Sequence, residues 1–109
     1  MKRYLILTVN PGSTSTKIAV FRNLKSVLLK TLTHSVDDLD EYERITDQFQ
    51  YRKEMIMNEL RDSEIPIDGI SAVVGRGGLI RPVESGVYEV NEPMLKDLRE
   101  GRLGEHASN

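Results

Sequence analysis

The chain has 109 residues, which is enough for one domain or part of one, and a modest core is possible at this length. Hydrophobic residues make up 39% and charged residues 29% of the sequence, so wholesale disorder and a fibrous repeat are excluded, and the net charge of −2 gives no reason to expect nucleic acid or an anionic membrane as a partner. Cysteine is absent, which excludes disulfides and thiolate metal sites and fits a cytosolic protein, and two histidines are too few to build a metal centre.

Two short apolar runs lie on either side of a polar turn near the start of the chain. Residues 4–9 and 18–21 are rich in β-branched side chains, and each run is typical of a buried strand. The first run is too short to span a bilayer and lacks a signal-peptide cleavage pattern. Because residues 10–17 between the runs contain a Pro-Gly turn, we predict a β-hairpin.

The tip of this hairpin suits phosphate. Ser13, Thr14, Ser15 and Thr16 are expected there, together with the backbone N–H groups that a glycine turn leaves accessible. Hydroxyls and oriented amides donate hydrogen bonds to anionic oxygens, and Lys17 adds a positive charge. Taken alone, the segment is also consistent with an ordinary polar turn, which such a composition usually forms.

A third strand and a long helix are expected next. Residues 27–33 continue the β-like composition, so three strands should form an antiparallel meander, with His34 at the solvated end of the third. Ser35 begins a capping box. Apolar residues at steps of three, four and seven then predict a helix that runs to about Asp62, with room for a break near Thr46.

The second half of the chain predicts a fourth strand at residues 70–74. Because a helix precedes this strand, it should lie parallel to an earlier strand through a right-handed crossover. The Gly-Arg-Gly-Gly loop at 75–78 follows at its carboxyl end, where open α/β sheets place ligands, although such a loop alone is more often a tight turn than a site. Residues 87–90 indicate a further short strand, and Asn91 and Gly101 mark the start and the end of a last helix.

Several separate segments resemble the acetate and butyrate kinase family. Residues 10–17 are similar to its first phosphate motif, and residues 73–82, 85–92 and 104–109 resemble the butyrate kinase branch in particular. The order of the predicted elements is that of an incomplete α/β, ribonuclease-H-like half domain of the actin, sugar kinase and heat-shock ATPase superfamily. The resemblance covers nearly the whole chain but only the opening third of such an enzyme, so we expect residues 1–109 to be the amino-terminal part of the first acyl-kinase domain, without the second domain.

The resemblance implies a phosphotransferase. Its reaction would be the reversible phosphorylation of a short-chain carboxylate such as butyrate, with ATP and Mg²⁺, to give an acyl phosphate. It further implies a cytoplasmic homo-oligomer without nucleic-acid or membrane partners, in which this fragment alone is inactive. The alternative is a non-catalytic nucleotide-binding or protein-interaction module that keeps a kinase-like hairpin.

The resemblance also assigns site residues. Four residues match family positions beside the transferred phosphate: Asn10, Ser13, Ser15 and Lys17. Arg76 is the candidate to hold the carboxylate or the phosphoryl oxygens, because a guanidinium offers a planar fork to either group. His106 resembles an active-site histidine that donates to the phosphoryl oxygens in the transition state.

One departure and one exclusion accompany these assignments. The acetate kinase branch carries its arginine in a longer segment before the two glycines, whereas Arg76 directly precedes Gly77. The acidic run at 37–43 is interpreted as a solvated helix start, so no magnesium ligand is assigned within the chain.

Overall fold

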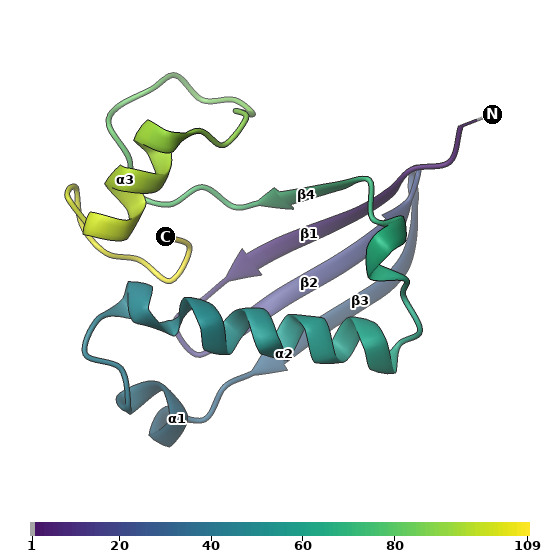
Figure 1. Cartoon of the computed structure of the whole chain (residues 1–109), viewed down its shortest axis with the longest axis horizontal. Coiled ribbons are helices and arrows are strands. Elements are labelled where there is room, and N and C mark those ends of the chain that lie inside the picture. The colour runs from purple at the N-terminus through teal and green to yellow at the C-terminus, as the bar shows by residue number, and fades with distance from the viewer. Residues whose placement is uncertain (1) are drawn as a thin grey trace.

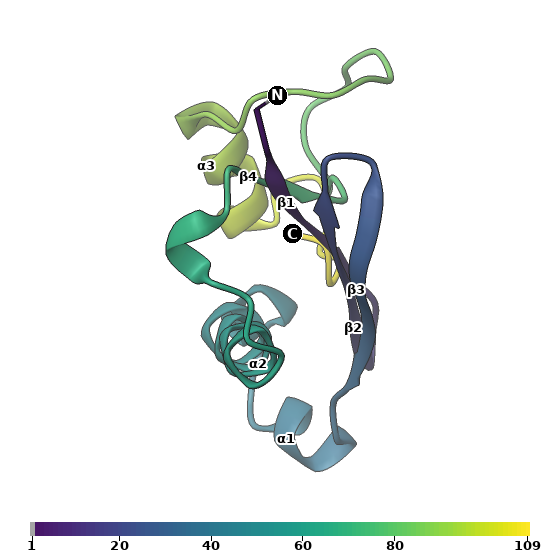
Figure 2. The same ribbon diagram turned by 90° about the vertical axis from the view of Figure 1, so that its right-hand side faces the viewer.

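A computed structural model describes residues 2–109 as a four-stranded sheet with helices against one of its faces (Figures 1 and 2). The elements follow one another as β1 (Leu5–Pro11), β2 (Ser15–Arg22), β3 (Lys25–Thr33), α1 (Val36–Asp40), η1 (Ile45–Gln48), α2 (Phe49–Asp62), η2 (Ile67–Gly69), β4 (Ala72–Gly75) and α3 (Glu92–Glu100). No helix in the described part of the chain is long and apolar enough to cross a membrane.

The sheet is mixed and has the strand order β3-β2-β1-β4. The first three strands pair antiparallel through short turns, and β4 pairs parallel with β1 after the crossover that contains α2. The predicted α/β class, the three-stranded meander and the parallel fourth strand are therefore confirmed.

The core lies between the sheet and α2, which Figure 2 shows against one face of the strands. Side chains alternate between the two faces of a strand, so every second residue of β1 and β2 contributes to this core. Its buried members are Leu7, Ile18, Val20, Leu32 and Leu60. Because Leu60 comes from α2 and the others come from strands, this one helix closes the apolar face of the meander.

The helical region between β3 and β4 is interrupted. Ser35 does cap a helix, since its hydroxyl accepts the Asp38 N–H at 3.1 Å, but α1 ends at Asp40. A second start follows at η1, where the Asp47 carboxylate accepts the Arg44 N–H at 3.3 Å. The stretch to Asp62 is therefore two α-helices separated by residues 41–48, which include η1, and the break near Thr46 is confirmed.

The prediction of a short strand at residues 87–90 is wrong. The segment is exposed, with Val87 at 93%, and it pairs with no strand. Within the described residues the sheet ends at β4, which pairs only with β1, and residues 87–90 do not join its free edge. The last helix is confirmed, because Asn91 Oδ1 accepts the Met94 N–H at 3.1 Å and Gly101 ends α3 with a φ of 61°.

Candidate functional site

The tip of the β1–β2 hairpin is shorter than the sequence predicts. The strands extend to Pro11 and from Ser15, and the Gly12 N–H closes the turn by donating to the Ser15 carbonyl at 2.7 Å. Ser13 and Thr14 are exposed at the tip. Ser15 and Thr16 already belong to β2, and Thr16 is fully buried, so it cannot contact a ligand at the tip as expected.

Three of the predicted site residues lie in one row across the sheet. Asn10 of β1 is paired with Lys17 of β2, and both are exposed. The Arg76 N–H donates to the Val9 carbonyl at 3.0 Å, and one more step of the β1–β4 register puts exposed Arg76 beside Asn10. Since neighbouring strands are about 4.8 Å apart, the row presents two cations and an amide within a span of about 10 Å.

This row belongs to the sheet face opposite α2. Asn10 and Lys17 alternate with Val9 and Ile18, which face the core, so their side chains project from the other face. The two cations therefore do not compete with the apolar packing of α2. They remain available to an anion that approaches the carboxyl end of β1.

His106 is attached to the loop that follows β4. Ser108 Oγ donates to the Gly77 carbonyl at 3.1 Å, and the Ser108 backbone N–H donates to His106 Nδ1 at 3.1 Å. Ser108 Oγ also lies 2.8 Å from His106 Nδ1, so Nε2 is the nitrogen of this exposed ring that has no contact with Ser108. The segment that carries His106 is thus held beside the Arg76 loop, at the same end of the sheet as the hairpin (Figure 1).

A buried polar cluster lies under the hairpin, on the α2 face. We call it the hairpin support cluster, and its members are Thr16, His34, Gln48 and Arg52, which are 0%, 2%, 8% and 6% exposed. Arg52 donates to the carbonyls of Ser13 and Ser15, and burial lowers the pKa of its guanidinium.

The prediction that His34 lies at a solvated strand end is wrong. Its Nε2 is 2.7 Å from Thr16 Oγ1, and the Tyr51 ring packs edge-on with its centroid 5.3 Å away. Burial, and then the charge of Arg52, lower the pKa of His34. The first residue after β3 therefore lies beneath α2 and not in water.

Sequence reasoning missed Gln48 and Arg52 because polar positions of an amphipathic helix are normally assigned to solvent. One signal was available. Arg52, Ile56 and Leu60 are spaced by four residues, so Arg52 falls on the apolar stripe that α2 turns toward the sheet. A charge on that stripe indicates a buried polar contact.

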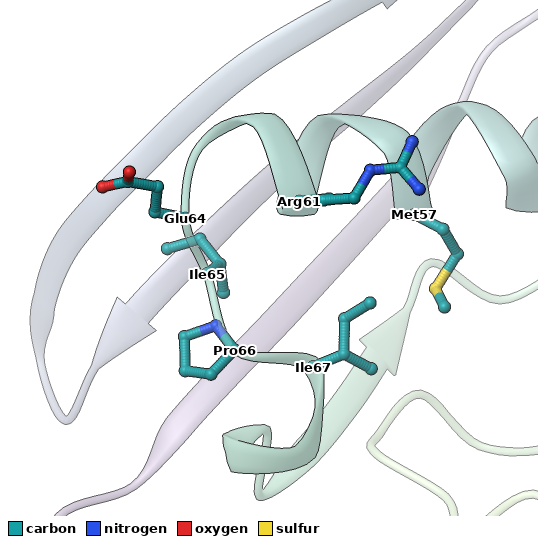
Figure 3. Close-up of a pocket in the computed structure, with 6 residues that line it drawn as sticks. All are labelled: Met57, Arg61, Glu64, Ile65, Pro66 and Ile67. Carbon is teal, nitrogen blue, oxygen red and sulfur yellow. The ribbon is translucent and has the colours of Figure 1, made fainter.

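Two other features lie outside this site. Within residues 2–109, no group of three or more His, Cys, Asp or Glu side chains could hold a metal ion. A shallow hollow between the end of α2 and η2 is lined by Met57, Arg61, Glu64, Ile65, Pro66 and Ile67 (Figure 3). Since this hollow is at the opposite end of α2 from the hairpin, it contains none of the predicted site residues.

The chain has strong sequence similarity to curated proteins, although no known family profile matches it. It is 55% identical over 107 residues to butyrate kinase 2 of Clostridium acetobutylicum. It is also 49% identical over 106 residues to butyrate kinase 1 of the same species, and 50% identical over 106 residues to a probable butyrate kinase of Clostridium botulinum.

This chain is a homologue of butyrate kinases. The similarity to butyrate kinase 2 covers 98% of the chain, so the hairpin, Arg76 and His106 all lie within the shared part. The chain spans about 30% of the length of the butyrate kinases that it matches. The resemblance stated from the motifs is therefore confirmed, and the roles of the individual residues stay predictions.

Proposed function

We propose that this chain is the amino-terminal part of the first domain of an acyl kinase, which uses ATP to phosphorylate a short-chain carboxylate such as butyrate. The observation that carries the proposal is the row of Lys17, Asn10 and Arg76 beside the hairpin of a butyrate kinase homologue. In this reaction a carboxylate oxygen attacks the γ-phosphorus of ATP. The bond from that phosphorus to the β,γ-bridging oxygen breaks, and ADP leaves.

Positioning and charge stabilisation are most of the catalysis in phosphoryl transfer, and each predicted residue fits one of these tasks. The exposed hairpin offers the hydroxyl of Ser13 and the charge of Lys17 to phosphate oxygens. Arg76 would hold the carboxylate or the phosphoryl oxygens through its planar fork. His106 would donate from Nε2 to the oxygens that gain charge in the transition state.

The nucleotide and its metal fit this chain to different degrees. The hairpin residues Asn10, Ser13, Ser15 and Lys17 are suited to the phosphates of ATP. Mg²⁺ would neutralise phosphate charge, but among the described residues no group of three or more His, Cys, Asp or Glu side chains could hold it, so no step is assigned through it. We further propose that the complete protein is a cytoplasmic homo-oligomer with ATP and the carboxylate as its partners, and with neither nucleic acid nor a membrane among them.

The proposal is tested in the complete protein by trapping the acyl phosphate as a hydroxamate, with butyrate and ATP as substrates. Ser13→Ala and Lys17→Ala should each lower kcat/KM by on the order of 10²-fold, the usual cost of one lost transition-state donor. Arg76→Lys should not retain function, because a point charge cannot replace a bidentate fork.

Lys25→Ala is the matched control, since it removes an exposed lysine at the opposite end of the same sheet. It should keep the wild-type rate. Rates within a factor of about two of wild type for both hairpin variants would remove the hairpin from the mechanism. A complete protein that binds ATP without any turnover would favour a non-catalytic nucleotide-binding module.

A further inference from the structure

We infer that Arg52 is a positioning residue for the phosphate site: its buried guanidinium holds the inner side of the hairpin and places a positive charge behind the tip. This inference rests on the proposed function of the hairpin. It concerns a side chain that never meets the substrate, because Arg52 is 6% exposed and lies on the α2 face of the sheet.

The guanidinium contacts the hairpin at its tip and at the first residue of β2. Arg52 Nη2 donates to the Ser13 carbonyl at 3.1 Å, and Nη1 donates to the Ser15 carbonyl at 3.0 Å. These two serines carry hydroxyls that are predicted to bind phosphate. Fixing both carbonyls from below therefore fixes where the two residues lie relative to α2, which is a preorganised arrangement.

The guanidinium is itself held in one orientation. Gln48 Oε1 accepts from Nε at 3.1 Å and from Nη2 at 3.0 Å, and Thr16 Oγ1 accepts from Nη1 at 3.1 Å. Together with the two serine carbonyls, these contacts use all five N–H donors of the arginine. A lysine, with three donors on a flexible stem, cannot make the same set.

No carboxylate among residues 2–109 forms an ion pair with Arg52. The ion pairs of the described residues are Lys30–Glu59, Arg44–Glu105 and Arg81–Asp97, and none of them includes Arg52. A buried cation that only neutral oxygens solvate is costly, because burial removes the guanidinium from water. In a poorly solvated interior its field also extends further than in water, and two of the carbonyls that the guanidinium contacts belong to Ser13 at the tip and to Ser15.

The experiment compares Arg52→Met and Arg52→Lys in the complete protein with the control Arg61→Met. Arg61 is also on α2, and its guanidinium donates to Asn58 at the end that is away from the hairpin. Kinetics give the KM for ATP and kcat, and thermal unfolding gives the rise in Tm on addition of ATP. Arg52→Met should raise the KM for ATP about tenfold or more, because losing one hydrogen bond to a charged group has a cost of that size. The same variant should lose most of the ATP-induced rise in Tm. Arg61→Met should keep the wild-type KM for ATP and the ATP-induced rise in Tm.

A merely structural role gives a different result. It would lower the number of active molecules, and so the apparent kcat, while the remaining molecules kept the wild-type KM and the ATP-induced rise in Tm. That result overturns the inference. Full recovery of the KM by Arg52→Lys would overturn its geometric part, because charge alone would then suffice.

A second variant keeps the test decisive if Arg52→Met does not fold. Gln48→Leu leaves the cation in place and removes the acceptor that orients it, so it should also raise the KM for ATP, and an unchanged KM counts against the inference. A different set of results would reject the proposed function. Wild-type rates in Ser13→Ala and Lys17→Ala would reject the hairpin itself, whereas impaired rates there with a normal KM in Arg52→Met reject only the role of Arg52.

Discussion

At the scale of one residue, the hydrogen bonding of the buried His34 ring depends on Thr16 and Arg52. Thr16 Oγ1 accepts a hydrogen bond from Arg52 and lies 2.7 Å from His34 Nε2. The other ring nitrogen, Nδ1, is buried and has no hydrogen-bond partner within residues 2–109. Leaving a buried polar atom unpaired costs about 1–3 kcal/mol of folding free energy.

The stability of the fold should therefore depend on pH through His34. Burial and the charge of Arg52 lower its pKa below the ordinary value of 6.5, so the unfolded chain binds this proton more readily than the folded chain. The free energy of unfolding should fall as the pH drops below about 6.5. Urea unfolding between about pH 5 and pH 8 measures this slope.

His106→Gln is the control for the pH slope, because it removes the exposed histidine and leaves the buried ring of His34 in place. His34→Gln should remove most of the slope. An equal slope in wild type and His34→Gln would contradict the assignment to the buried ring.

At the scale of elements, the two larger helices are attached by different forces. Hydrophobic packing attaches α2 to the sheet. The attachment of α3 is largely polar: Arg81 donates to Asp97, which lowers the pKa of that carboxyl, and Arg44 Nη2 donates to the Glu100 carbonyl at the end of the helix at 2.9 Å. Because apolar contacts with α2 close the main core, we expect α2 to carry more of the stability.

Leu60→Ala tests this expectation. Leu60 is 1% exposed in the core, and truncating a buried leucine to alanine usually costs about 2–5 kcal/mol, which is a large part of the stability of a small domain. Met57→Ala on the same helix is the control, because Met57 is 37% exposed and should cost much less. Urea unfolding compares the two variants, and equal losses would contradict the location of the core.

At the scale of the whole molecule, much apolar surface is exposed on the β4 side. Within the described residues, β4 pairs with a strand on one edge only, and its Val73 and Val74 are 63% and 44% exposed. The segment that follows adds Val87 and Val90, at 93% and 66%. Unpaired edges and apolar patches favour pairing between chains.

We therefore predict that residues 1–109 alone self-associate, form no measurable acyl phosphate and bind ATP weakly. The catalytic reason is that the proposed site residues of the hairpin, Arg76 and His106 would contact the reactants from one side, whereas phosphoryl transfer needs its reactants positioned from more than one side. Light scattering and hydroxamate trapping with butyrate and ATP measure the two halves of this prediction. A clean monomer at high concentration, or turnover well above the no-protein control, would contradict it.

The sequence by itself determined the elements whose signals are local. The meander and the capped last helix were predictable, because alternation, turn residues and caps are recorded within a few neighbouring positions. The crossover rule then placed the strand at 70–74 parallel to an earlier one. The motifs also identified the hairpin as a phosphate candidate, and their resemblance pointed to the family in which the relatives are found.

Only the tertiary structure decided what depends on distant residues. Arg52 reaches Ser13 across 39 positions, and no local pattern records such a contact. The same holds for the row of Asn10, Lys17 and Arg76, which exists because β4 adds to the β1 edge in one register. The burial of His34 was missed for this reason too: whether the residue after a strand meets water or a helix depends on where α2 packs, and that is a property of the assembled core.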